Sequence, residues 1–302
     1  MHKPEQMGKS SVERLTRGAS RIKERRVIAL PDSERLAGFL SQAAAERFVI
    51  HEATDNRQGR ESRRFDAVAF MEHFSRAPLP AEIGCTLSHL DVLRQFGEAP
   101  GCAGDLVLVA EDDARFVHSF EQALSAIEPH VPESALVVLA DPYGPGGVRD
   151  RSLESRSEYF VQLSLLATRL GQSAGIKGLQ IGRWSAGLTG TGAYLATRCA
   201  AQRITRFVAD QCDGLPWWMA DYHGVYRDHI GIDVLVVRPN LADWEGDSSI
   251  QDESHDAWRL GEHVGPKGQA RWPLLAKEGA RRFKMQIKST KFDVEWRLRH
   301  RK

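Results

Sequence analysis

The chain has 302 residues, of which 42% are hydrophobic and 27% are charged, as in an ordinary globular protein. No segment approaches the run of about eighteen apolar residues that a membrane-spanning helix needs, and the N-terminus lacks the apolar core of a secretory signal. The cysteines form no Cys-x-x-Cys pair and no metal-ligand spacing. We therefore expect a cytoplasmic protein with reduced thiols.

The net charge of +1 hides an uneven distribution along the chain. Residues 1–26 carry a charge of +5 and residues 267–302 carry +9, which leaves −13 on residues 27–266. Basic ends on an acidic body favour contact with an anionic partner such as the inner face of a membrane, with a solvated charged surface as the equal alternative. We expect no nucleic-acid partner.

Strands and helices alternate in the first half of the chain. Short buried strands are predicted over 26–30 and 46–53, with a helix over 33–44 between them. Residues 55–66 are polar and predicted to form a loop, and an apolar stripe predicts a helix over 84–97 before the apolar strand 106–110. This alternation predicts an α/β fold with a mostly parallel central sheet.

The second half is less regular. The pattern Ser119–Gln122 predicts a capped helix that starts near Ser119, and residues 134–141 and 232–240 are predicted strands. Residues 149–185 form a polar insertion, 190–205 are predicted as a Gly-rich turn followed by a helix, and 241–270 are loop-rich. In the tail, apolar residues alternate with polar ones, which favours a β-hairpin over a helix: Phe283, Met285, Ile287, Phe292, Val294, Trp296 and Leu298.

A buried strand that ends on Glu111, Asp112 and Asp113 is unusual, because adjacent like charges repel and burial makes the repulsion stronger. A receiver-type phosphoacceptor pocket is disfavoured, since that family begins with this strand and Asp141 comes too early for its second Asp. A hard cation such as Mn²⁺ or Mg²⁺ would neutralise the acids, and a solvated strand-to-loop transition explains them equally well. The triplet alone does not decide between these two.

The segment Glu-Ile-Gly-Cys-Thr-Leu-Ser-His at 82–89 precedes this strand. Together the two segments resemble the paired signature of glycosyltransferase family 25, which includes lipooligosaccharide and collagen galactosyltransferases. Weaker similarities extend over residues 26–251: Leu-Pro-x-Ser at 30–33, Ala-x-Asp at 53–55, Gly-Thr-x-x-Tyr at 190–194 and a late block at 216–250. The chain departs from the family at Ala29, where Asn is usual, and at Asn56, where Gly is usual.

The resemblance implies a GT-A-like nucleotide-diphosphate-sugar-binding domain over 26–251, between a basic arm (1–25) and a basic extension (252–302). It implies metal-dependent, inverting transfer of a hexose, with galactose expected, from a UDP-sugar to a saccharide or glycolipid acceptor in surface-glycan synthesis. Mn²⁺ or Mg²⁺ would be held by Glu111, Asp112 and Asp113. The donor would be bound by Leu30, Pro31, Arg35, Ala53, Asp55, Ser88, His89 and Asp112.

An inverting transfer needs a base for the acceptor hydroxyl, and Asp221 is the candidate, with Asp247 in reserve. Trp217 and Trp218 are candidates for acceptor binding, although core packing explains adjacent Trp residues as well. Cys85 is expected to be a small core residue, and the Gly-Thr-Gly at 190–192 only a turn. The alternative for the whole chain is an inactive sugar- or polyanion-binding accessory protein with the same fold.

Overall fold

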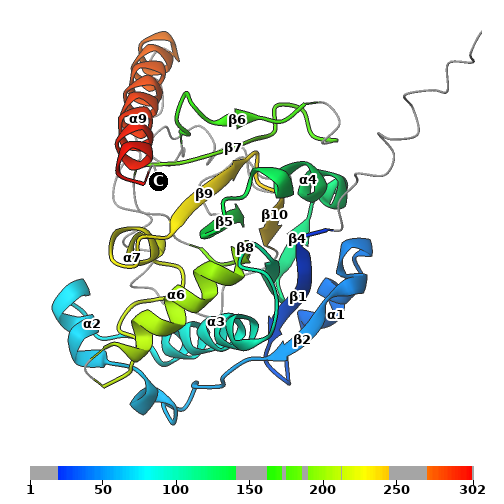
Figure 1. The fold of residues 1–302 in the computed structure, drawn as a ribbon, viewed down its shortest axis with the longest axis vertical. Coiled ribbons are helices and arrows are strands. Elements are labelled where there is room, and N and C mark those ends of the chain that lie inside the picture. Colours follow the sequence, from blue (N-terminus) through cyan, green and yellow to red (C-terminus); the bar gives the residue numbers. More distant parts are fainter. Residues whose placement is uncertain are drawn as a thin grey trace, which may run out of the picture.

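The protein is built around one large sheet (Figure 1). The computed structural model describes residues 20–140, 162–171, 175–185, 190–211, 213–244 and 271–300. Within these residues an eight-stranded sheet has the order β2-β1-β3-β8-β5-β9-β7-β6. Its strands are β1 (Ile22–Ala29), β2 (Val49–Glu52), β3 (Leu106–Glu111), β5 (Ala135–Ala140), β6 (Thr168–Arg169), β7 (Gln180–Gly182), β8 (Ala193–Thr197) and β9 (Asp233–Arg238).

The sheet is mostly parallel, as the sequence predicts. Strands β1, β2 and β3 run in parallel, and so do β5 and β9, whereas β8 is antiparallel to both of its neighbours and so is β7. Six of the eight described strands therefore point the same way. A separate antiparallel pair joins β4 (Ala114–Phe116), directly after the acidic triplet, to β10 (Ala242–Trp244).

Helices cover both faces of the sheet, because its strands are apolar on both sides. On β3, Leu106 and Leu108 pack into one core with α1 (Leu36–Leu40) and α4 (Phe120–Ile127). Val107 and Val109 point the other way, into a core with three helices, α3 (Pro80–Glu98), α6 (Arg198–Ala209) and α7 (His223–Asp228). Helix α2 (Ala67–Phe74) packs on the outer side of α3, and 3₁₀ turns lie at Ala43–Arg47, Ser62–Arg64 and Glu128–His130.

Several predicted elements need correction. Strand β1 begins at Ile22, so the basic arm predicted over 1–25 overlaps the sheet, and Arg25 is buried in an ion pair with Glu121 of α4. Ser119 does stand before α4, but its side chain makes no capping hydrogen bond. Residues 193–197, predicted within a turn and helix, form the central strand β8.

The tail is a helix, α9 (Arg271–Arg299), and the predicted β-hairpin is wrong. The alternation of apolar and polar residues predicted a hairpin with one apolar and one charged side. Instead, Ser289, Asp293 and Trp296 turn inward at helical spacing, whereas Phe283 and Leu298 are exposed. Across the described residues, no helix has both the length and the apolar character needed to cross a bilayer.

Candidate functional site

Most of the predicted metal-binding and donor-binding residues lie near the ends of the first three parallel strands. From β1 the chain moves to β2 on one side and later to β3 on the other, so the order of strands reverses between β1 and β3. In open α/β sheets, ligands bind in the crevice outside the carboxyl ends of the strands at such a switch point. β3 ends at Glu111 and β1 ends at Ala29, so the acidic triplet and the segment 30–35 both lie at this edge.

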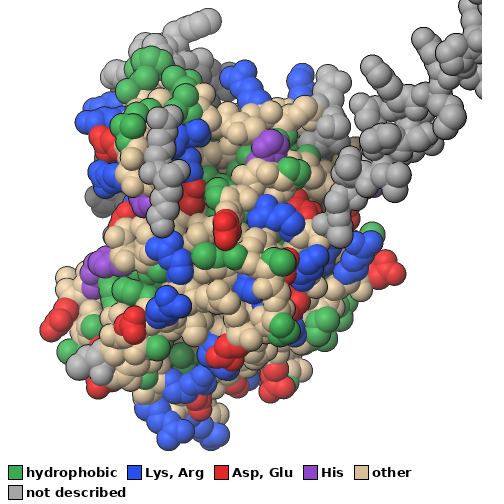
Figure 2. All heavy atoms as spheres, viewed as in Figure 1, with side chains coloured by type: hydrophobic (Ala, Val, Ile, Leu, Met, Phe, Trp, Pro, Cys, Tyr) green, Lys and Arg blue, Asp and Glu red, His purple; other side chains and the backbone are tan. Residues whose placement is uncertain are grey.

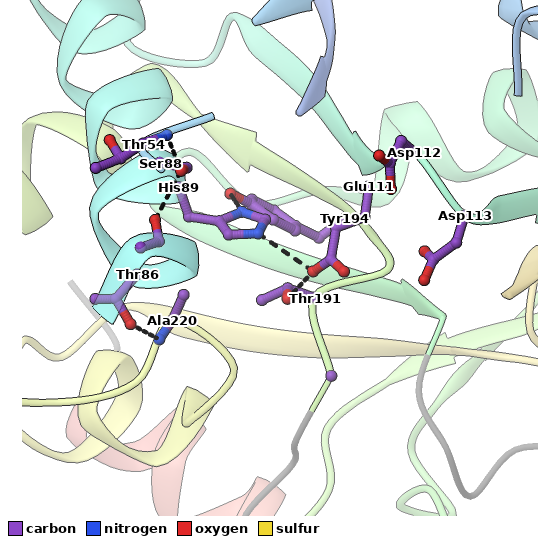
Figure 3. A network of polar contacts seen from close by, with 12 residues as sticks. Thr54, Thr86, Ser88, His89, Glu111, Asp112, Asp113, Thr191, Tyr194 and Ala220 are labelled. Carbon is purple, nitrogen blue, oxygen red and sulfur yellow. Dashed lines mark hydrogen bonds and ion pairs between the residues drawn. The ribbon is translucent and has the colours of Figure 1, made fainter. Parts of the chain in front are cut away.

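Glu111 is held by side chains from two other elements (Figure 3). Its Oε1 lies 3.3 Å from Nε2 of His89 on α3 and accepts a hydrogen bond from the Thr191 hydroxyl. Nδ1 of the same imidazole lies 3.0 Å from the Tyr194 hydroxyl on β8. His89 is buried, so its imidazole contacts the acidic triplet and positions Glu111 from behind.

The other two acids are held by the segment that follows β1. The guanidinium of Arg35 lies 2.9 Å from Asp112 and 3.3 Å from Asp113, and the Ser33 hydroxyl donates to Asp112. One arginine therefore bridges two carboxylates at the tip of the strand. Arg35 lies one position before its expected place in the family pattern, but the structure brings it to the acids.

The three acids differ in their electrostatics. Burial pushes the pKa of Glu111 upward, but the hydrogen bond and charge of His89 and the hydrogen bond of Thr191 outweigh it, so that this pKa lies below its ordinary value. Burial and then the charge of Glu111 raise the pKa of Asp113 to about 7, against the opposing effect of Arg35. Asp113 Oδ1 is buried and has no hydrogen-bond partner among the described residues. Negative charge at this tip is therefore only partly compensated.

A group of possible metal ligands includes only part of the predicted triplet. Cys85, His89 and Glu111 each offer one ligand atom within 4.8 Å of the others, so this group could hold a metal ion. The sequence alone predicts Cys85 to be a small core residue. Burial raises the pKa of its thiol well above the ordinary value, so the thiol is protonated at neutral pH.

Ser88 supports the site from within α3. Its hydroxyl donates to the Gly84 carbonyl (2.7 Å) and accepts from the Thr54 amide (2.8 Å), and the residue is fully buried. Gly84 is required at this crossing, because a Cβ there would lie 2.7 Å from the Thr54 carbonyl oxygen. The prediction that Ser88 contacts a donor is therefore corrected: its hydroxyl is used to fix the segment after β2.

The remaining donor candidates lie along the same edge. Leu30 is partly buried and Pro31 exposed just after β1, while Ala53 packs on the core with its amide bonded to the Ala29 carbonyl. Asp55 is paired with Arg57, and the hydrogen bond from Arg57 lowers the pKa of this carboxyl to about 2. Arg57 also reaches Asp32, which links the loops after β1 and β2.

Of the two acceptor-binding candidates, Trp217 is partly exposed and Trp218 is buried. Trp218 has no exposed surface and lies in the core beside Tyr226, so the prediction that it contacts an acceptor is corrected. Trp217 is only partly buried, and its ring contacts those of His73 and His229. The backbone between Trp218 and Asp221 is tied to α3 by the Thr86 hydroxyl, which accepts from the Ala220 amide at 3.1 Å.

Asp221 lies close enough to the metal-ligand group to act on it electrostatically. Its charge acts on both the Cys85 thiol and Arg76, and Arg76 is itself paired with the buried Glu82 of α3. Asp247, the reserve base, lies outside the described residues.

Sequence reasoning missed three contacts at the strand tip, those of Ser33, Thr191 and Tyr194. Signals for all three were present, in Leu-Pro-x-Ser at 30–33 and Gly-Thr-x-x-Tyr at 190–194. The sequence predicts that the Gly-Thr-Gly is only a turn, but Thr191 donates to Glu111, which corrects that prediction. No protein-family model matches the chain, and no curated protein matches it.

Proposed function

We propose that the chain is a metal-dependent inverting glycosyltransferase with a GT-A-like domain, which moves a hexose from a UDP-sugar to a saccharide or glycolipid acceptor. The observation that carries the proposal is the position of Glu111, Asp112 and Asp113 at the carboxyl end of β3, beside the switch point between β1 and β3. A donor diphosphate at this edge would need a cation next to it, and the acids would need the same cation.

The carboxylates suit a hard divalent cation. Mn²⁺ and Mg²⁺ take oxygen ligands, and Asp113 offers a buried oxygen that no described residue hydrogen-bonds. Glu111 and Asp113 would hold the ion, with Asp112 beside them. When bound, the ion would offset the charge that develops on the leaving diphosphate. The Cys85, His89 and Glu111 group contains sulfur and nitrogen ligands, which favour Zn²⁺ instead.

Arg35 would serve the donor. In the described structure its guanidinium compensates Asp112 and Asp113. A divalent cation would take over that compensation, and Arg35 would then be able to turn toward the phosphates, for which its planar donors are well matched. Leu30, Pro31 and the Asp55–Arg57 pair lie along the same edge and would border the nucleotide.

Asp221 would act on the acceptor side. In a single displacement the acceptor oxygen attacks the anomeric carbon, the bond from that carbon to the diphosphate breaks, and the acceptor proton passes to the Asp221 carboxylate. Trp217 is the aromatic surface available for an acceptor sugar ring, since Trp218 is buried.

The proposal is tested by thermal unfolding of the full chain with UDP and UDP-sugars, each with Mn²⁺, Mg²⁺, Zn²⁺ or a chelator. At a hundredfold excess over Kd, a ligand stabilises the folded state by about 2.7 kcal/mol, which corresponds to a rise in Tm of about 4 °C in a protein of this size. We expect that rise for UDP-sugar with Mn²⁺ and not with the chelator.

Measuring UDP release distinguishes an active enzyme from an inactive sugar-binding protein. Asp221→Asn should keep the Mn²⁺-dependent rise in Tm while UDP release falls by about 10²–10⁴-fold, the usual contribution of a general base. A protein whose Tm responds to no nucleotide-sugar with any of the three ions would contradict the proposal. A response with no UDP release from the unsubstituted protein would favour the accessory-protein alternative.

A further inference from the structure

Helix α9 turns a mixed polar and aromatic face toward the body of the protein and an apolar face outward. Its inward face contains Ser289 and Asp293, both with no exposed surface, together with the buried Trp296. Four large apolar side chains point outward instead, with exposed fractions of 62% for Phe283, 45% for Ile287, 42% for Val294 and 64% for Leu298. Burial of these four side chains against the body of the protein therefore does not explain how α9 is placed.

Polar contacts fix the rotation of α9 on the body. Arg183, which follows β7, pairs with Asp233 at the start of β9 and lies 2.8 Å from Asp293. The Thr290 hydroxyl accepts from the Leu165 amide at 2.9 Å, and the guanidinium of Arg227 lies 4.9 Å from the ring centre of Phe292. These contacts define which side of the helix faces outward.

The outward apolar residues form one continuous stripe. Their separations of four, seven and four residues keep them on one face at 3.6 residues per turn. Leu165 and Leu166, also exposed, border this face, since their backbones contact Thr290 and Arg297. We call these six residues the α9 stripe: Phe283, Ile287, Val294, Leu298, Leu165 and Leu166.

Basic side chains flank the stripe. One side of the stripe carries four exposed basic residues, Lys284, Lys288, Lys291 and Arg299. The acidic residue Glu295 lies among them and is paired with Lys291 and Arg299. In Figure 2, hydrophobic side chains gather over α9 at the upper left, with Lys and Arg side chains next to them. Residues 267–302 as a whole carry a charge of +9.

We propose that the α9 stripe binds the surface of an anionic lipid bilayer, with the helix lying in the plane of the interface. A polar face, an apolar face and lysines at the boundary are the features of helices that bind in this way. The lysines would contact anionic headgroups while the apolar residues enter the boundary with the acyl chains. A second copy of the chain is a poorer occupant, because pairing two α9 stripes would bring two strongly basic helices together.

The test is co-sedimentation of the full chain with vesicles of phosphatidylcholine, with and without phosphatidylglycerol. It requires no metal or sugar donor, so its outcome is independent of the proposed enzymatic function. We expect binding to the anionic vesicles at low salt that weakens sharply as salt rises, because screening shortens the reach of the lysine charges.

Three double variants locate the binding surface. Phe283→Ser with Leu298→Ser should weaken binding at least about tenfold, because less apolar area enters the interface. Lys288→Gln with Lys291→Gln should weaken it by about 25-fold, at about fivefold for each lysine. Val68→Ser with Met71→Ser is the matched control, since these exposed apolar residues lie on α2, away from the stripe, and binding should not change.

Two results would overturn the proposal. One is that the unsubstituted chain fails to bind anionic vesicles at low salt. The other is that the Phe283→Ser, Leu298→Ser variant binds as well as the unsubstituted chain while its Tm is unchanged, since binding would then come from the basic segments alone. A self-association that this variant abolishes, with vesicle binding unaffected, would assign the stripe to a second copy of the chain.

Discussion

The imidazole of His89 joins α3 to the tip of β3, with Nε2 3.3 Å from Glu111 Oε1, and joins both to β8 through Tyr194. The two sequence segments that resemble a paired signature, 82–89 and 106–113, are therefore in contact. His89 acts on Glu111 from beneath the surface, so its role is to position a carboxylate. The buried side chains of α3 therefore support the acidic triplet at the tip of β3.

Asp113→Asn should stabilise the metal-free protein at alkaline pH. The pKa of Asp113 is raised from 3.8 to about 7, so the folded state disfavours the charged form and stability falls as pH rises through that window. Asparagine removes this loss, which is at most a few kcal/mol at about 1.4 kcal/mol per pKa unit. Tm should rise relative to the unsubstituted protein at pH 8 and change little near pH 4, and any stabilisation by Mn²⁺ should disappear.

Asp112→Asn is the companion variant. Asp112 is paired with Arg35 at 2.9 Å and accepts from Ser33, so its charge is compensated. Its removal should lower Tm at pH 8 instead of raising it. Equal responses of the two variants would contradict the division of the acids into one paired and one partly uncompensated carboxylate.

Ser88→Ala should destabilise the protein more than Ser125→Ala. Both hydroxyls donate to the carbonyl four residues earlier in their helix, at 2.7 Å for Ser88 and 3.0 Å for Ser125. Ser88 also accepts from the Thr54 amide, which would be left without this partner, at a cost of about 1–3 kcal/mol. Urea unfolding of the two variants measures the difference, and similar midpoints would show that the contact with Thr54 adds little.

Substitutions of the two tryptophans should separate stability from binding. Trp218→Ala should lower the free energy of unfolding by about 3–5 kcal/mol, because the side chain is fully buried. Trp217→Ala should lower it much less and should reduce transfer to the acceptor without changing the response to the donor. The measurements are urea unfolding and UDP release, the latter with and without acceptor, and a large loss of stability in Trp217→Ala would place that ring in the core too.

Glu121 should contribute to acid unfolding. The hydrogen bond from Arg25 lowers the pKa of Glu121 below its ordinary value of 4.5. The stability from this pair is complete above that value and is lost as pH falls through the lower folded pKa. Glu121→Gln should therefore lower Tm at pH 7 and flatten its decrease below pH 4.5, while Glu98→Gln, on the exposed end of α3, should do neither.

Local patterns in the sequence identified the elements with strong periodicity. The stripe Leu87, Leu90, Leu93 and Phe96 predicted α3, and the apolar run 106–110 predicted β3, because burial of a face or of a whole strand leaves a local trace. The acidic triplet was also predicted to follow a buried strand, and it lies at the carboxyl end of β3.

Tertiary structure decided the orientation of side chains between elements. No local sequence pattern indicates that Arg35 bridges Asp112 and Asp113. The same is true of the hydrogen bond from the Thr54 amide to the Ser88 hydroxyl, and of the burial of Trp218 in place of Trp217. The tail was mispredicted for the same reason: the inward face of α9 is chosen by the contact of Asp293 with Arg183, which lies 110 residues earlier in the chain. The sequence by itself determined which segments are helices or strands wherever burial is periodic, and only the fold determined which charges meet, because ion pairs between distant residues leave no periodic pattern.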